Sequence, residues 1–244
     1  LKSDNQNPIT NVTDIIFSKN YLLTRGIINI NMFRYDGTHV TEVGTQGRGP
    51  GEFITISDVD IDPENESIYI SDGLQPKFLV FNNSGIAVRT FKGPITGQMR
   101  FRFTKNGILC YYLNHYGNIE DSYILIDTTG SIIRNFPNRY PWKRNVPGGA
   151  FEGENIFYRF NNQLFKKEIY CDTIFIYNDK TFEQYKIIDA GKQRLTPQAR
   201  SKVGNKSEAS LLLKNYINPF NLFEFGDFIY YEFGVTMNGI FDLK

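Results

Sequence analysis

The stretch Met32-Phe-Arg-Tyr-Asp-Gly37, with Thr38-His-Val-Thr-Glu-Val43 directly after it, reads as two short strands joined by a tight turn. Asp followed by Gly is hairpin-turn chemistry, because glycine adopts positive φ without strain. The arrangement recurs at residues 79–85 and 125–130, so that successive turn glycines lie 48 and 45 residues apart. A fourth copy, at residues 174–180, lacks the glycine. A strand-turn-strand unit therefore repeats along the chain.

A second set of strand-like runs lies in phase with these turns. Each of these runs is rich in aromatic or β-branched residues. Their aligned positions are Leu22, Ile68, Ile108, Ile156 and Ile229, and successive positions are separated by 46, 40, 48 and 73 residues. With one further strand in front, each unit has four short strands in about 40–50 residues, the size of a propeller blade. A β-sandwich is the competing all-β interpretation, but a sandwich has no reason to repeat in phase. We therefore predict an all-β fold, a β-propeller.

The predicted propeller is one domain over residues 1–244, with blades that start near residues 11, 57, 99, 148 and 218. The fifth is incomplete at Lys244, and propellers close as whole rings of typically 4–8 blades, so we expect six blades in the whole protein. The long last step contains a helical insertion near residues 192–217. Thr196-Pro197 predicts its start, with Thr as the N-cap and Pro at the first helical position.

Composition excludes several classes of protein. Lys+Arg 27 against Asp+Glu 26 leaves a formal charge of +1, which argues against a basic nucleic-acid sleeve, and we expect no nucleic-acid partner. An aromatic fraction of 15% favours β-structure. Two cysteines, Cys110 and Cys171, do not make a disulfide scaffold, and we expect both to be buried. No apolar run approaches the roughly 18 residues of a transmembrane segment.

Residues 33–53 resemble the signature of a bacterial six-bladed β-propeller family of the Bacteroides type, related to the NHL-repeat propellers and composed of predicted envelope lipoproteins. The matching positions are Tyr35, Asp36, Gly37, Gly44, Gly47, Gly49, Pro50, Gly51, Glu52 and Phe53. Residues 58–62, 68–72 and 171–175 also look like the family, and the likeness covers about residues 11–190. It implies an exported protein, periplasmic or associated with the outer membrane of a Gram-negative bacterium. No lipobox cysteine lies at the N-terminus, so a lipid anchor would lie upstream of the printed chain.

The glycine-rich part of this stretch is not a phosphate cradle. A P-loop needs Gly-Lys-Ser/Thr opening a helix, whereas Pro50 stands at that place and strands follow. We expect an inter-blade connection instead. In that structural loop the glycines supply unusual φ angles, and Arg48 and Glu52 pin the chain by charged hydrogen bonds. The loop residues are Gly44, Gly47, Arg48, Gly49, Pro50, Gly51 and Glu52.

The chain shows little catalytic or metal-binding chemistry. Its densest carboxylate run is Asp58, Asp60, Asp62, Glu64 and Glu66, which suggests calcium by composition but fails the EF-hand spacing. We expect a half-buried strand there, and no cofactor, with calcium as the remaining alternative. Only two histidines, His39 and His115, are present, and no Gly-x-Ser-x-Gly elbow exists. This composition weighs against the propeller lyases and the metal-dependent lactonases, and no catalytic residue is assigned.

The best candidate for a binding loop is residues 136–149, which hold the only Trp and three prolines. Tyr140 and Trp142 are candidates to stack on a sugar ring or peptide, with Arg139 and Arg144 donating to carboxylates. The alternative is a blade linker with Trp142 packed inward. Arg100 and Arg102 share one face of a strand. That strand is either innermost, where they would line the channel, or an exposed outer edge.

The leading functional hypothesis is a non-catalytic binding or scaffold module of the bacterial cell envelope. Its partner would be a glycan, a peptide or a protein, recognised by loops on one face of a rigid propeller. The alternative hypothesis is a propeller-type lyase or hydrolase with a metal at the central channel. A purely structural part of an envelope complex is the third hypothesis.

Overall fold

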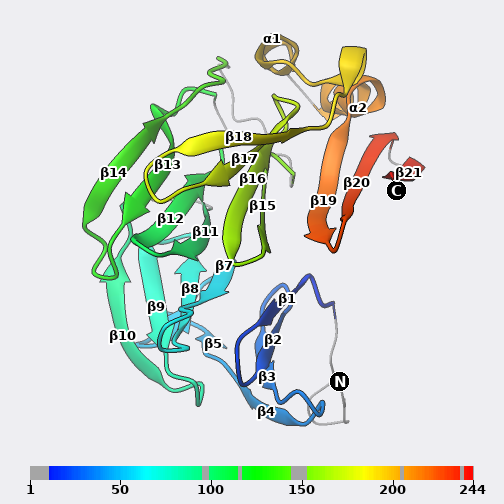
Figure 1. Ribbon diagram of the computed structural model, residues 1–244. Helices are drawn as coiled ribbons and strands as arrows, with labels where there is room; N and C mark the ends of the chain where they lie inside the picture. Colours follow the sequence, from blue (N-terminus) through cyan, green and yellow to red (C-terminus); the bar gives the residue numbers. More distant parts are fainter. Residues whose placement is uncertain are drawn as a thin grey trace. The chain divides into compact units, whose positions relative to one another are not determined.

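The computed structural model describes residues 11–94, 99–114, 117–143, 153–203, 206–236 and 239–243 (Figure 1). Four sheets each contain four strands, and the strands lie in the order in which they occur along the chain. Sheet 1 consists of β1 (Asp14–Phe17), β2 (Leu22–Arg25), β3 (Ile30–Phe33) and β4 (His39–Glu42). Sheet 2 consists of β7 (Ile56–Ile61), β8 (Ile68–Asp72), β9 (Lys77–Phe81) and β10 (Ala87–Lys92).

The remaining sheets continue the pattern. Sheet 3 consists of β11 (Met99–Thr104), β12 (Gly107–Tyr112), β13 (Asp121–Ile126) and β14 (Ile132–Pro137). Sheet 4 consists of β15 (Asn155–Phe160), β16 (Gln163–Glu168), β17 (Thr173–Tyr177) and β18 (Phe182–Ile187). Sheet 5 has three strands, β19 (Asn218–Phe225), β20 (Phe228–Thr236) and β21 (Gly239–Leu243). A short parallel pair, β5 (Thr45–Gln46) and β6 (Glu52–Phe53), connects sheet 1 to sheet 2.

Successive four-stranded sheets of this kind are the blades of a β-propeller. The prediction of an all-β propeller is confirmed, and the described chain contains four complete blades. Helices occur between sheets 4 and 5, at η1 (Gly191–Gln193), α1 (Pro197–Ser201) and α2 (Lys206–Asn215), where the insertion was predicted. No helix within the described ranges has the length and apolar composition needed to cross a bilayer.

The chain forms two compact units, and each is described by itself. Unit 1 contains residues 1–112 and 123–135, and unit 2 contains residues 113–122 and 136–244. Within unit 1, the first strand of sheet 2, β7, lies beside both β1 and β11. Within unit 2, β15 lies beside β19. The first strand of each of these sheets is therefore its inner strand.

The predicted turns have the predicted backbone. The three turn glycines all have positive φ, at 86° for Gly37, 76° for Gly85 and 95° for Gly130. In the fourth copy Asp179 takes the left-handed conformation in place of glycine, with φ at 67°. Asn178 supports that turn, since its side-chain oxygen accepts the backbone N–H of Thr181 at 2.9 Å. Short polar side chains tolerate this conformation better than other residues do.

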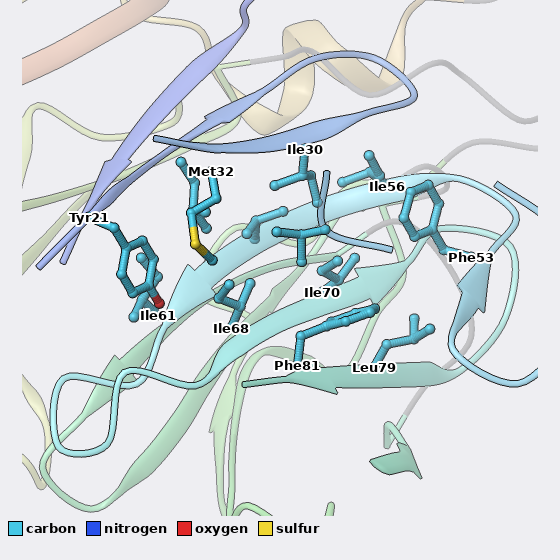
Figure 2. Close-up of a cluster of buried hydrophobic side chains, with 13 residues drawn as sticks. Tyr21, Ile30, Met32, Phe53, Ile56, Ile61, Ile68, Ile70, Leu79 and Phe81 are labelled. Atoms are coloured by element: carbon cyan, nitrogen blue, oxygen red, sulfur yellow. The ribbon is translucent and has the colours of Figure 1, made fainter. Parts of the chain in front are cut away.

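One hydrophobic cluster of unit 1 lies between sheets 1 and 2. Figure 2 shows Ile30 and Met32 of β3 packed toward Ile68 and Ile70 of β8, and all four side chains are almost fully buried. The middle strands β2, β3, β8, β9, β12 and β13 are mostly buried, whereas the first strand β1 and the fourth strands β10 and β14 are mostly exposed. Both cysteines are buried and free, as predicted. The burial of flat rings and branched chains between pleated faces explains the high aromatic content.

The repeated turn glycines also solve a packing problem between neighbouring sheets. A Cβ at Gly85 would lie 2.7 Å from Thr41 Cγ2 on β4, and one at Gly130 would lie 2.3 Å from the carbonyl oxygen of Lys92 on β10. In sheets 2 and 3, the turn before the fourth strand therefore lies in close contact with the fourth strand of the preceding sheet. Glycine is needed at these positions for close approach as well as for positive φ.

Gly130→Ala should lower the free energy of unfolding by roughly 2–3 kcal/mol, because left-handed strain adds to the contact with the Lys92 carbonyl. Gly226→Ala is the matched control, since its φ is 53° and a Cβ there meets nothing within 4 Å. The control should cost about 1 kcal/mol. Urea unfolding of both variants measures the difference. Equal losses would show that backbone strain alone selects the turn glycine.

Candidate functional site

The predicted binding loop packs against the helical insertion. Trp142 is 4% exposed and belongs to a hydrophobic cluster separate from the blade cores. The other buried members of this cluster are Ile169, Tyr170, Leu195, Val203 and Leu212. Trp142 is therefore not an exposed stacking platform, which corrects the role considered for it. The indole ring has a large apolar surface. Its burial in this cluster removes that surface from water and so stabilises the fold.

The insertion is held in shape by local hydrogen bonds that the sequence predicted in part. The side-chain oxygen of Thr196 accepts the backbone N–H of Ala199 at 3.1 Å, and Pro197 occupies the first helical position. This is the predicted N-cap of α1. The N–H of Ile217 donates to the carbonyl of Gln193 at 2.8 Å, which joins the two ends of the insertion.

A buried ion pair fastens the insertion to sheet 4. Arg200 of α1 is 1% exposed, and its Nε lies 4.0 Å from Oε1 of Glu154, which is also 1% exposed and directly precedes β15. The Arg200 guanidinium carbon lies 4.7 Å from the centre of the Trp142 ring. The Tyr170 hydroxyl donates to Glu154 Oε1 at 3.2 Å. An ion pair, a cation–π contact and a hydrogen bond therefore link Arg200, Glu154, Trp142 and Tyr170 in one small group of side chains.

Burial raises the pKa of Glu154 to about 7, although Arg200 and the hydrogen bond from Tyr170 oppose that rise. The carboxyl group has little access to water, so its charged form is disfavoured. Burial is also the main cause that raises the pKa of Tyr170, with Glu154 adding to the effect. The ionisation of Glu154 therefore falls in the neutral range.

A raised pKa in the folded state favours the protonated form, so Glu154 contributes stability that is complete below its ordinary pKa of 4.5 and is lost as the pH rises through about 7. Each pKa unit corresponds to about 1.4 kcal/mol. The melting temperature should fall between about pH 5 and pH 8. In Glu154→Gln, which has no charge to gain, this fall should be smaller. An identical fall in the variant would assign the pH dependence to other groups.

The other side chains of the predicted binding loop differ in their exposure to solvent. Arg139 is exposed, and its guanidinium lies 5.7 Å from the centre of the Phe175 ring. Tyr140 is half-buried, and its ring centre lies 6.0 Å from that of Tyr170. Arg144 lies outside the described residues. Among the predicted ligand-binding residues of this loop that the structure describes, Arg139 has the most accessible side chain.

Arg100 and Arg102 lie on β11, an inner strand beside β7 and not an exposed outer edge, and their lining of a channel stays a prediction. Arg102 Nη1 donates to Asp58 Oδ2 at 2.7 Å. Burial lowers the pKa of Arg102, but Asp58 and the nearby Asp60 and Asp14 raise it by more, so that the net shift is upward. Arg102 is thus held in place by carboxylates of neighbouring strands.

The acidic run on β7 bridges two sheets. Asp58 Oδ2 accepts the backbone N–H of Phe101 at 2.8 Å, and Asp60 Oδ2 accepts that of Phe103 at 2.8 Å. Ser57 Oγ likewise accepts the N–H of Met99 at 2.7 Å. Alternate N–H groups of the sheet-edge strand β11 are satisfied by side chains from β7, which explains the alternating polar pattern.

The same contacts bear on the calcium alternative. The carboxylates of Asp58 and Asp60 are used by peptide N–H groups, and Asp62 accepts the N–H of Glu64 at 2.9 Å within its turn. In the part of the chain that the structure describes, no group of three or more His, Cys, Asp or Glu side chains is placed to hold a metal ion.

The glycine-rich loop packs as a connection between sheets 1 and 2. Glu52 Oε2 accepts the N–H of Gly49 at 2.6 Å, and a Cβ at Gly47 would lie 2.0 Å from the same oxygen. Gly44 and Gly51 have positive φ, at 69° and 77°. Arg48 is exposed, and the charged side chain that binds the loop backbone is Glu52 instead. The pinning role considered for Arg48 is not observed.

Sheet 5 carries an aromatic surface that sequence reasoning missed. Phe223 pairs with Tyr230 across the hairpin, and Phe225 pairs with Phe228, so all four lie on one face. The two pairs are stacked, with ring centres 4.8 Å and 5.7 Å apart. The three phenylalanines are exposed. The opposite face packs on sheet 4. The alternation on both sides of the turn at Gly226 was the available signal.

Four-stranded meanders joined through their inner strands place the protein among the β-propellers. The chain belongs to the DUF4934 family, described as a domain of unknown function, whose sequence profile matches residues 4–244. No curated protein matches the chain.

Solved structures share the fold at low sequence identity. A protein from Bacteroides fragilis that is predicted to be exported is 18% identical, with a TM-score of 0.79 over 97% of this chain and 69% of that one. A member of the DUF4221 family from Bacteroides vulgatus is 12% identical, with a TM-score of 0.62 over 95% and 74%. A streptogramin B lyase is 15% identical, with a TM-score of 0.53 over 98% and 74%. At these identities the likeness establishes the fold alone.

Proposed function

We propose that the protein is a non-catalytic binding or scaffold module of the bacterial cell envelope. Its recognition surface would be the accessory element, which we define as residues 136–143, 191–203 and 206–217. The partner would be a glycan, a peptide or a protein, and Arg139 and Tyr140 remain the ligand-binding candidates of the loop. Function carried by an added segment on a rigid scaffold is common, because the scaffold keeps the ordering cost of binding low.

The observation that carries this proposal is the separate cluster around Trp142. The cluster buries Trp142 and Arg200 and leaves the cations of the same segments at the surface, including Arg139, Lys143 and Lys202. The buried side chains of the accessory element thus attach it to sheet 4, while its polar side chains stay accessible to solvent. By contrast, the charged side chains of β7 and β11 are engaged in holding sheets together.

Two further parts of the proposal concern the whole protein. We propose export to the periplasm or outer membrane, with a lipid anchor, in line with the predicted export of the Bacteroides fragilis protein. We also propose six blades in all. The exposed aromatic face of sheet 5 supports this number, because a further blade would cover it. The solved proteins are also longer than this chain, which spans 69% and 74% of the two Bacteroides structures.

The lyase alternative receives no specific support from the described residues. The likeness to a streptogramin B lyase is a likeness of fold at 15% identity. Fold alone does not carry function, since one propeller scaffold supports many activities. Metal analysis of the purified protein separates the two hypotheses, because the alternative requires a bound metal.

A thermal-shift screen with glycans, peptides, Ca²⁺ and Zn²⁺ tests the proposal, since a ligand that prefers the native state raises the melting temperature. We expect a glycan or peptide to produce a shift that Arg139→Ala/Lys143→Ala reduces. Both side chains are exposed, so the double variant should fold normally. A shift with a metal alone would favour the enzyme, and a glycan or peptide shift unchanged in the variant would remove the loop from the recognition surface.

A further inference from the structure

The charge of the chain is strongly segregated. The 33 residues of the accessory element hold eight of the 27 Lys and Arg residues but only one of the 26 Asp and Glu residues, Glu208. The formal charge is therefore +7 in this element and −6 in the rest of the chain. The overall charge of +1 conceals this division. A local field of one sign selects partners of the opposite sign even when net charge is near zero.

Most of these cations are exposed where the structure describes them. The exposed ones are Arg139, Lys143, Lys192, Arg194, Lys202 and Lys214. The ion pairs described for the element are those of Arg194 with Asp172, at 2.7 Å, and of the buried Arg200 with Glu154. Asp189 lies just before the element, and its carboxylate accepts the N–H of Gly191 at 2.8 Å. Of these six exposed cations, Arg194 is paired with an acid, and no ion pair is described for the other five.

The two segments of the element form one surface. The backbone N–H of Lys143 lies 3.4 Å from its acceptor, Ser201 Oγ, at the end of α1. Trp142, Leu195 and Leu212 share the buried cluster beneath. Cations from the loop and from the insertion are consequently presented by a single packed unit, and their fields add at its surface.

The side chains between the cations indicate what kind of anion fits. Leu211 of α2 is 54% exposed and lies one helical turn from Lys214. Within the described accessory element no aromatic ring is fully exposed, since Trp142 is buried and Phe136, Tyr140 and Tyr216 are half-buried. Recognition of single-stranded nucleic acid or of sugar rings commonly uses exposed rings for stacking. Binding to an anionic lipid surface is instead favoured by basic side chains with an apolar side chain among them.

We propose that the accessory element binds anionic lipid headgroups and so holds the propeller at a membrane surface. This inference rests on the proposed role of the accessory element as the recognition surface, and it adds anionic lipid to the glycan, peptide or protein partner proposed above. The lysine and arginine side chains would contact the headgroups, and Leu211 would enter the boundary between headgroups and acyl chains. Attraction of this kind weakens as salt is added, because ions screen exposed charges.

Cosedimentation with vesicles tests the proposal. The protein should bind vesicles of phosphatidylcholine mixed with phosphatidylglycerol but not vesicles of phosphatidylcholine alone, and added salt should weaken binding. Lys192→Gln/Lys202→Gln/Lys214→Gln should reduce binding by at least about tenfold. The matched control is Lys19→Gln/Lys92→Gln/Lys105→Gln, which removes the same charge from exposed positions of unit 1 and should bind normally. Equal losses in both variants would overturn the assignment to this surface.

A second pair of measurements separates lipid from other polyanions. Leu211→Gln should weaken vesicle binding and leave binding of dextran sulfate unchanged. Binding of dextran sulfate without vesicle binding would overturn the lipid assignment and favour an acidic polysaccharide. Failure to bind either probe would overturn this inference alone, because the glycan and peptide screen tests the proposed function separately. Equal melting temperatures of the variants confirm that they are folded.

Discussion

Asp58→Ala should lower the free energy of unfolding of unit 1 by about 3 kcal/mol. Asp58 Oδ2 accepts both the N–H of Phe101 at 2.8 Å and Arg102 Nη1 at 2.7 Å. Its Oδ1 lies 3.7 Å from Nη1 of Arg25. Removing the carboxylate leaves a buried peptide donor without its acceptor and a partly buried guanidinium without its counter-charge. Urea denaturation followed by circular dichroism measures the loss.

Asp14→Ala is the matched control for Asp58→Ala. Asp14 pairs with the same Arg25, at 3.0 Å, but its side chain is 46% exposed. Exposed ion pairs contribute little, so we expect a loss of about 0.5 kcal/mol. Similar losses in the two variants would contradict the assignment of Asp58 as the link between β7 and β11.

Arg200→Ala should release the insertion from sheet 4. Glu154 would remain buried at 1% exposure without the cation that offsets its charge, and the Trp142 ring would lose its cation–π partner. Above about pH 7, where Glu154 is ionised, breaking this buried pair on one side should cost about 3–5 kcal/mol. We expect rapid proteolysis within residues 191–217, while sheets 4 and 5 remain protected. Limited proteolysis followed by mass spectrometry locates the cleavage.

Two further variants make the Arg200→Ala result decisive. Arg194→Ala removes the exposed pair with Asp172 and should leave the cleavage pattern unchanged. Arg200→Met combined with Glu154→Gln replaces both charges by neutral groups of similar size and should restore most of the protection. If Arg200→Ala is cleaved no faster than the wild type, the buried pair is not what fastens the insertion.

The turns and the blades were predictable because they depend on local chemistry. Gly37, Gly85 and Gly130 mark positions where the backbone requires positive φ, and their spacing reveals the repeat. The start of α1 was predictable for the same reason, since the cap at Thr196 involves residues three apart. The alternating acids of β7 indicated a strand correctly. That they serve the N–H groups of another strand depends on which sheets are neighbours.

The candidate site was less predictable because its contacts join distant segments. Trp142 was the natural choice for a stacking residue, and only the fold shows that the insertion covers it. Arg200 and Glu154 lie 46 residues apart and carry no motif, so no sequence signal pairs them. The charge segregation was present in the sequence all along. It becomes informative once the loop and the insertion are seen to pack as one element.

We place recognition on the accessory element and structural support on the inner strands. Hydrogen–deuterium exchange, with and without vesicles that contain phosphatidylglycerol or the glycan or peptide that raises the melting temperature, tests this division directly. We expect bound protein to be protected in residues 136–143, 191–203 and 206–217, while β7 and β11 exchange as in the free protein. Protection confined to β7 and β11 would contradict this division and would place the ligand at the inner strands.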